Sequence, residues 1–350
     1  MLSEKPRQEN YTREISVGQQ AMKPKRAKSK QKGFIVVVVL CIIICMAVLL
    51  MGFNYQSRTN LRAVGDFQKS AQALNCAKAG LNVAIAAIKG ADETNTKKTS
   101  PNLLSEENTI DIGDGKCSIT ITEENAKLNV NLLKDKSGKP NRTRIDQLLR
   151  LIDLLNKDRS DYSHIGYGLV PAIIDWTDSD DKVTRLPFIK HENSGAESAY
   201  YGDLETPYKC NNAQFSATEE LLLVKGITPQ VFERIRDYVT VYGDGKININ
   251  CASKRVIESL SEKMDHVLAQ MIIDRRKIKP FDSIMELRDV PGMTDAIYNT
   301  IRNTATVSPT DEYYHATSRG KVGHRNCTVM AILRKNMKTK NVEVILYKES

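Results

Sequence analysis

The sequence predicts an α+β fold in which a long N-terminal helix packs on a small β-sheet and a large helical domain interrupts the strands. An uncharged apolar run at residues 34–53 is followed by more helical sequence, and residues 138–308 carry helix patterns broken by Pro and Gly. Alternating β-branched residues predict strands on both sides of that block. The predicted strands lie at residues 116–122, 127–133, 327–333 and 342–347.

The charge of the N-terminal segment fixes an orientation. Residues 1–33 carry nine Lys or Arg against three Glu, a net charge of +6 out of +9 for the whole chain. By the positive-inside rule this leader stays in the cytoplasm and the C-terminal bulk crosses the membrane. About 20 apolar residues are enough to span a bilayer. We therefore expect a single span at residues 34–53. Much of the basic pI comes from the leader, whose charge sets the membrane topology.

Gly33 and Phe34 mark the boundary between the leader and the apolar run. A secretory signal has small residues at a cleavage site after its apolar core, whereas here the small residue precedes the core. The junction resembles a prepilin processing site cut between Gly33 and Phe34, which leaves the apolar helix in the mature protein. The alternative is a plain single-span anchor with Gly33 in a loop.

The helix is expected to continue beyond the membrane. No proline occurs between Pro24 and Pro101, and apolar residues recur from Leu61 to Ile88 at steps of three, four and seven. One half of the helix then lies in the bilayer and the other packs on a sheet. We assign residues 54–137 and 309–350 to this head and residues 138–308 to the inserted domain.

Two helix-hairpin-helix signatures occur in the inserted domain, at residues 222–228 (L-L-V-K-G-I-T) and 287–294 (L-R-D-V-P-G-M-T). Each has a glycine turn followed by a threonine that caps the next helix. Such hairpins either bind DNA phosphates or pack against protein. Residues 140–306 carry 22 Lys or Arg against 25 Asp or Glu, whereas phosphate binding favours a basic face. The charge therefore favours protein packing over nucleic acid.

The seven cysteines leave the disulfide pattern open. Cys41 and Cys45 lie in the apolar helix, where they are expected to pack as small hydrophobes. The other five face an oxidising compartment if the topology is right, so they could form one or two disulfides and would leave at least one thiol over. None has a metal-ligand spacing. These five are Cys76, Cys117, Cys210, Cys251 and Cys327.

An acidic cluster is the one metal candidate in the sequence. Asp175, Asp178, Asp180 and Asp181 are closely spaced, and Glu197 follows. Such carboxylates repel one another unless they are solvated or bridged by a hard cation, and Ca²⁺ accepts six to eight oxygens. The spacing does not match an EF-hand, and a solvated loop is the alternative. No catalytic constellation is recognisable, so an enzyme is not expected.

The ordered set of motifs resembles the general secretion pathway protein K family, the type II secretion minor pseudopilins. The resemblance extends over most of the chain and implies a pilin-like head with an inserted SAM-like or helix-hairpin-helix domain. Its motifs are the Gly33/Phe34 junction, residues 127–133 (K-L-N-V-N-L-L), 173–181 (I-I-D-W-T-D-S-D-D), 195–201 (G-A-E-S-A-Y-Y), 207–208, 219–227 and 246–252.

This resemblance implies a non-enzymatic tip subunit in the inner membrane with its C-terminal domain in the periplasm. It implies processing by a prepilin peptidase, N-methylation and assembly with other minor pseudopilins. It also implies calcium, which we place on Asp178, Asp180, Asp181 and Glu197. The alternative function is a membrane-anchored DNA receptor of the competence type, since residues 246–294 resemble its paired hairpins.

Val38 separates this chain from most pilins, which carry a glutamate at the fifth position after the cleavage site. That carboxylate neutralises the amino terminus of a neighbour in an apolar filament core. A subunit at the very tip has no neighbour above it, and burying an unpaired carboxylate is costly. We therefore interpret Val38 as a tip determinant; the alternative is a merely lipid-facing residue.

Overall fold

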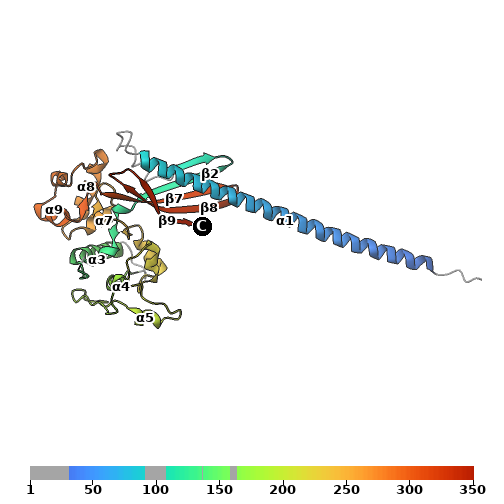
Figure 1. The fold of residues 1–350 in the computed structure, drawn as a ribbon, viewed down its shortest axis with the longest axis horizontal. Coiled ribbons are helices and arrows are strands. Elements are labelled where there is room, and N and C mark those ends of the chain that lie inside the picture. The colour runs from blue at the N-terminus through green and yellow to red at the C-terminus, as the bar shows by residue number, and fades with distance from the viewer. Residues whose placement is uncertain (1–30, 91–107, 136, 158–163) are drawn as a thin grey trace, which may run out of the picture. The chain divides into compact units, whose positions relative to one another are not determined.

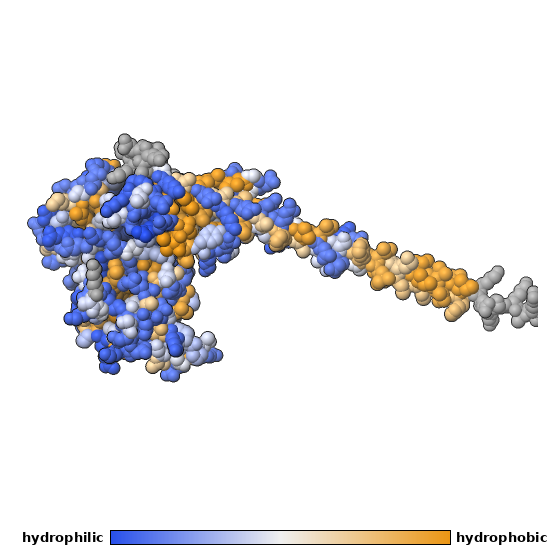
Figure 2. Space-filling view, viewed as in Figure 1, coloured by the Kyte–Doolittle hydropathy of each residue, from blue (hydrophilic) through white to orange (hydrophobic). Residues whose placement is uncertain are grey.

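The computed structural model describes residues 31–90, 108–135, 137–157 and 164–350. The chain divides into two units, residues 1–64 and Gly65–Ser350, which are described separately. A helix, α1 (Gln31–Gly90), begins in the first unit and ends in the second. Its apolar part has a mean hydropathy of 3.5 and is long and apolar enough to cross a membrane. Figure 2 shows this part as a nearly continuous hydrophobic surface.

A five-stranded antiparallel sheet forms the head in the second unit (Figure 1). The strand order is β1-β2-β7-β8-β9, so β2 and β7 are neighbours although nearly 190 residues separate them in the chain. Three of the predicted strands, at 116–122, 327–333 and 342–347, are confirmed. The strands are β1 (Asn108–Ile112), β2 (Gly115–Glu123), β7 (Asp311–Val322), β8 (Arg325–Asn336) and β9 (Val342–Glu349).

Residues 65–90 of α1 pack closely on this sheet. Ala77, Leu81 and Ile88 are buried against β2, β7 and β8. A Cβ built on Gly80 would lie 2.1 Å from the Cys117 sulfur, and one on Gly320 would lie 2.0 Å from the Ala73 carbonyl oxygen. Helix and sheet therefore approach more closely here than side chains at these glycines would allow.

Residues 127–133 are not a strand of the head. β3 (Leu128–Asn129) pairs in parallel with β4 (Val239–Thr240), and a short 3-10 helix, η2 (Val130–Leu132), follows. Leu128, Val130 and Leu133 are buried in the core of the inserted domain. The inserted domain therefore begins about ten residues before the predicted boundary at 138. The alternating apolar residues are compatible with a full strand, but they are equally compatible with two residues of strand followed by a short 3-10 helix.

The inserted domain is built mainly of short helices around one apolar core (Figure 1). A 3-10 turn, η1 (Glu124–Ala126), leads into it from β2. The remaining elements are α3 (Arg142–Lys157), α4 (Leu169–Thr177), α5 (Ser198–Gly202), η3 (Thr218–Leu223), α6 (Pro229–Ile235), β5 (Ile247–Asn248), α7 (Lys254–Ser259), α8 (His266–Ile278), η4 (Ile284–Asp289), α9 (Asp295–Ile301) and β6 (Ala305–Thr306).

Two modules of the same design make up this domain. The first module (residues 128–241) begins at β3 and ends at its parallel partner β4, and the second (residues 247–307) begins at β5 and ends at its parallel partner β6. Before its last strand, each module has a 3-10 helix, a glycine turn with positive φ and a threonine-capped helix. Identical residues 66 positions apart include Phe215/Phe281, Val224/Val290, Gly226/Gly292, Thr228/Thr294, Ile235/Ile301 and Thr240/Thr306.

Candidate functional site

Three carboxylates converge at the end of α4. Asp175 lies in its last turn, Asp178 is its C-cap and Glu197 is the N-cap of α5. One oxygen from each lies within 4.8 Å of the others. Asp180 and Asp181 are outside this group; the carboxylate of Asp180 instead accepts a hydrogen bond from the Lys182 backbone N–H at 2.8 Å. The structure thus brings together two of the four predicted ligands and adds Asp175.

The carboxylate group is buried without enough hydrogen-bond donors. Asp175 is fully buried, and its Oδ1 accepts from the Thr184 backbone N–H at 2.8 Å, but Oδ2 has no partner. Both oxygens of Glu197, which is also buried, have none. Burying carboxylate oxygens without hydrogen-bond partners is costly. Such oxygens are the ligands that a hard cation prefers, and the cation would neutralise their charge. The donor set therefore fits a calcium ion.

Burial raises the pKa of these carboxyl groups. Desolvation raises the pKa of Asp175 to about 6 against the opposing hydrogen bond from Thr184. The pKa of Glu197 rises to about 7, first through desolvation and then through the neighbouring charges of Asp175 and Asp178. The pKa of the Asp178 carboxyl group is also raised, mainly by burial. Protons and a divalent cation would therefore compete for the same oxygens.

The packing of the segment at residues 195–201 on α4 requires the glycine with which this motif begins. A Cβ built on Gly195 would lie 2.2 Å from Asp175 Oδ2 and 2.6 Å from the Pro171 carbonyl oxygen. Only a glycine lets this segment lie directly on α4 and bring Glu197 to Asp175. The Cys210 thiol lies beside them and donates to the Asp175 carbonyl oxygen at 3.6 Å.

Aromatic residues pack around Trp176, which follows Asp175 in α4. Trp176 is buried, packs edge-on against Tyr201 at 5.2 Å between ring centroids, and stacks on Phe215 at 6.4 Å. Tyr201 is fully buried, and its hydroxyl accepts from the Lys225 backbone N–H at 3.2 Å. Trp176 and Tyr201 are therefore core residues. Tyr200, which is partly exposed, lies under the Lys225 ammonium group at 4.7 Å.

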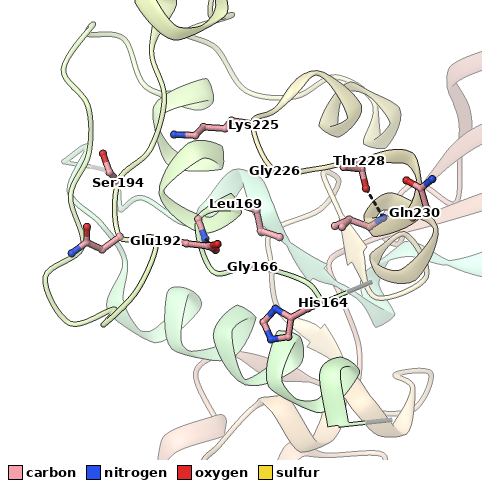
Figure 3. Close-up of a pocket in the computed structure, with 12 residues that line it drawn as sticks. His164, Gly166, Leu169, Glu192, Ser194, Lys225, Gly226, Thr228 and Gln230 are labelled. Atoms are coloured by element: carbon pink, nitrogen blue, oxygen red, sulfur yellow. Dashed lines mark hydrogen bonds between the residues drawn. The ribbon is translucent and has the colours of Figure 1, made fainter. Parts of the chain in front are cut away.

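A pocket of about 920 Å³ opens between the α3–α4 connection and the glycine turn of the first module (Figure 3). Glu192 has a positive φ of 53° and accepts a hydrogen bond from the Gly168 backbone N–H at 3.2 Å. A Cβ on Gly166 would lie 2.2 Å from the same carboxylate. The two glycines thus hold the loop at 192–194 in place. Figure 3 shows Glu192, Lys225 and His164 around the opening.

The predicted processing junction and tip determinant lie in the first unit. Gly33, Phe34 and Val38 all belong to α1, which begins at Gln31. Phe34 and Val38 are exposed along with the whole apolar segment. Each of the seven cysteines, all of which are among the described residues, carries a free thiol.

Sequence reasoning missed two kinds of residue. Asp175 was part of the cluster but was not chosen as a ligand, because its position inside a buried helix is invisible without the fold. Asn131 and Asn250, the last residues of the two N-x-N motifs at residues 129–131 and 248–250, donate to distant backbone carbonyl oxygens within their modules. The recurrence of the N-x-N pattern 119 positions apart was the available signal for the second set.

Comparison with known proteins agrees with this architecture. Residues 126–244 and 247–308 each match a family description, "Type II secretion system (T2SS), protein K". The two matches coincide with the two modules. The chain is 22% identical to the type II secretion system protein K of Aeromonas hydrophila over 271 residues, which is 75% of this chain and 77% of that protein. It is also 22% identical to that of Klebsiella pneumoniae, over 63% of this chain and 66% of that protein.

A solved structure shares the fold. The crystal structure of the GspK-GspI-GspJ complex from the enterotoxigenic Escherichia coli type 2 secretion system contains a chain that matches with a TM-score of 0.64 and 16% identity, over 83% of this chain and 99% of that chain. The pilin-like α+β fold is thereby confirmed, and nothing in these matches supports a competence-type DNA receptor. With both modules matched and the fold shared, the chain belongs to the type II secretion system protein K family.

Proposed function

We propose that this chain is a non-enzymatic minor pseudopilin at the tip of the type II secretion pseudopilus, supporting pseudopilus assembly and the export of folded proteins across the outer membrane. The observation that carries the proposal is the helical domain inserted between β2 and β7 of a helix-on-sheet head. A helical filament packs such heads side by side. A bulky insertion would collide with neighbours in the body of the filament, whereas the end of the filament leaves it free space.

Val38 supports the same position. Cleavage after Gly33 makes Phe34 the first residue and Val38 the fifth. A carboxylate there would need the amino terminus of a subunit above it, because an unpaired carboxylate in an apolar environment is costly. The tip subunit has no such partner, so an apolar side chain is favoured there.

Processing and topology can be tested together. The proposal places the leader in the cytoplasm, the apolar part of α1 in the inner membrane and the rest in the periplasm, with a prepilin peptidase cutting between Gly33 and Phe34. N-terminal sequencing from a peptidase-positive host should find Phe34 first, with its amine methylated. Gly33→Val should block the cut. Normal processing of that variant, or a mature chain that begins before Phe34, contradicts the assignment.

The partners proposed are two smaller pseudopilins, by analogy with the solved complex of GspK with GspI and GspJ. We expect the chain to co-purify with both in equal ratio. Deleting residues 124–310 should spare membrane insertion and abolish secretion. Immunogold labelling should place the chain at one end of purified filaments. Label along the whole filament length would contradict the tip position.

Calcium is proposed at Asp175, Asp178 and Glu197, where the cation supplies the positive charge that the buried oxygens lack. A ligand that binds only the folded state stabilises it by about 2.7 kcal/mol at 100 times its dissociation constant. Residues 65–350 should therefore melt at a lower temperature in chelator, and Glu197→Gln should remove the difference. Asp203→Asn, which changes an exposed carboxylate nearby, is the control.

Asp180→Asn tests the position that the sequence predicted and the geometry leaves outside the group. We expect this variant to keep the calcium response, because Asp180 does not reach the other carboxylates. Identical melting of the unmodified protein with and without calcium would refute the site itself.

A further inference from the structure

Helices α4 and α8 occupy the same place in the two modules. A Cβ built on Gly226 would lie 3.8 Å from the Leu169 backbone, and one built on Gly292 would lie 3.7 Å from the Leu268 side chain. The two glycines are 66 residues apart and lie in equivalent turns. Leu169 in α4 and Leu268 in α8 are therefore equivalent residues, and the acidic group of α4 can be compared with the same positions of α8.

The first module carries a segment that the second module lacks. Residues 178–214 connect α4 to Phe215, whereas only two residues connect α8 to Phe281, the counterpart of Phe215. Asp175 of α4 is fully buried, but Asp274, at the equivalent position of α8, is exposed. The extra segment therefore covers a carboxylate that the second module leaves in water.

Part of this segment is a hairpin at residues 184–197, which we call the 184–197 hairpin. The Gly195 backbone N–H donates to the Thr184 carbonyl oxygen at 3.0 Å and joins its two arms. Leu186 and Ile189 of the hairpin are buried in the core of the inserted domain. Burial of apolar side chains is favourable, so these residues favour a hairpin that is closed on α4.

The carboxylates oppose this closure. Glu197, the last residue of the hairpin, brings its carboxylate to within 4.8 Å of those of Asp175 and Asp178. The Thr184 backbone N–H donates to Asp175 Oδ1 at 2.8 Å, but Asp175 Oδ2 and both Glu197 oxygens have no partner. Burying unpaired carboxylates is costly, and like charges raise the cost. The closed hairpin therefore needs a positive charge beside these oxygens.

The second module supplies such a charge from its own helix. Asp274 accepts a hydrogen bond from the Gln270 amide at 2.9 Å, and its carboxylate lies 3.5 Å from the Lys277 ammonium group. The position of Lys277 is taken by Asp178 in the first module. The first module thus has a further carboxylate where the second has the cation.

No side chain of the first module replaces this lysine. The ammonium group of Lys134 interacts with the acidic group through its charge. Among the described residues, however, no Lys or Arg forms an ion pair with any of the three carboxylates. The positive charge must therefore come from a cation in solution.

We propose that Asp178 makes the first module depend on a divalent cation, and that this cation holds the 184–197 hairpin closed on α4. The inference rests on the calcium site proposed above and adds what the ion controls. Without the ion, the hairpin leaves α4 more often. Glu192 and Ser194 of the hairpin line the pocket beside Gly226, so the same movement widens that pocket (Figure 3).

Amide hydrogen exchange of the full-length chain in detergent micelles, followed by mass spectrometry, tests the proposal. The Thr184 amide is the reporter, because its N–H donates to Asp175 and is freed when the hairpin leaves α4. An ion that binds only the closed state suppresses opening about 100-fold at 100 times its dissociation constant. We expect Thr184 to exchange about 100-fold more slowly in calcium than in chelator, and peptides of α8 to exchange equally in both.

Asp178→Lys places the charge of the second module in the first. We expect its Thr184 amide to exchange slowly in chelator and to respond less than threefold to calcium. Asp178→Asn removes a ligand without supplying a cation, so its Thr184 amide should exchange faster in chelator than that of Asp178→Lys. Asp203→Asn changes an exposed carboxylate outside the group and should keep the full calcium response. Unchanged exchange in α8 shows that each variant is folded.

The outcomes separate this inference from the calcium site on which it rests. A chain that melts at a higher temperature in calcium, but whose exchange slows equally throughout the first module, contradicts the inference and not the site. A chain that responds to calcium in neither measurement contradicts both. Asp178→Lys that exchanges at Thr184 as fast as the unmodified chain in chelator contradicts the role given to Asp178.

Discussion

Asn131 and Asn250 make the same three hydrogen bonds in the two modules of the inserted domain. The Asn131 amide donates to the carbonyl oxygens of Phe215 and Val241, both at 3.0 Å, and its oxygen accepts from the Phe215 N–H at 2.9 Å. The Asn250 amide donates to Phe281 at 3.0 Å and Val307 at 3.3 Å, and its oxygen accepts from the Phe281 N–H at 2.9 Å. One side chain, just after the first strand of each module, thus joins the segment before η3 or η4 to the residue that follows the last strand.

Replacing either asparagine should destabilise the inserted domain. Asn131→Ala and Asn250→Ala each leave three backbone groups without their partner, and a buried unsatisfied group costs about 1–3 kcal/mol. We expect a loss of about 2–4 kcal/mol in each variant, measured by urea unfolding of residues 65–350. Asn211→Ala is the control, because Asn211 is exposed and, among the described residues, its side chain donates only to the Ala213 carbonyl oxygen, at 3.4 Å. A loss below that of the control would show that the asparagines do not hold the modules together.

Two glycines of α1 should respond oppositely to alanine. Gly80→Ala places a Cβ 2.1 Å from the Cys117 sulfur and 2.4 Å from the Ser318 hydroxyl, and overpacking costs about 1–3 kcal/mol. Gly65→Ala meets nothing within 4 Å and should gain about 0.5–1 kcal/mol from helix propensity. Thermal melting of residues 54–350, a fragment that keeps Gly65 inside the helix, measures both. Equal shifts of the two variants would mean that helix and sheet do not approach as closely as described.

Glu123 should make stability depend on pH. Burial raises its pKa to about 7, although hydrogen bonds from Cys251 and from the Asn248 amide (2.7 Å) oppose this; Glu312 raises the pKa further and Arg276 lowers it. Because the folded pKa exceeds the unfolded value of about 4.3, the stabilising contribution is present below pH 4.3 and is lost as pH rises through 7.

Residues 65–350 should therefore lose up to about 3 kcal/mol of this contribution between pH 4 and pH 8. Glu123→Gln keeps the shape and the acceptor for Asn248 but has no proton to lose, so its urea midpoint should vary less across this range. Measuring both proteins in chelator and in calcium separates this effect from that of the acidic group at α4. Identical pH profiles of the two proteins would contradict the assignment.

Val38→Glu should interfere with assembly. A carboxylate in the apolar part of α1 without a partner costs about 2.5–3.5 kcal/mol in a membrane. We expect the variant to reach the membrane but to enter filaments several-fold less than Val38→Leu, as measured by immunoblotting of sheared filaments. Full incorporation of Val38→Glu would instead indicate that an amino terminus is available above this subunit.

The sequence alone determined the features that depend on local pattern. The apolar run before Phe53, the alternation in β2, β8 and β9, and the threonine caps of the glycine turns each follow from side-chain period or backbone conformation. These signals are contained within about 20 residues, so no knowledge of distant contacts is needed to interpret them.

Only the tertiary structure decided which distant residues meet. Residues 127–133 alternate like a strand, yet β3 joins β4 more than 100 residues later, because the N-x-N side chains bind backbone that the local pattern does not contain. Asp175 joins Glu197 for a similar reason: Gly195 lets one segment lie on another.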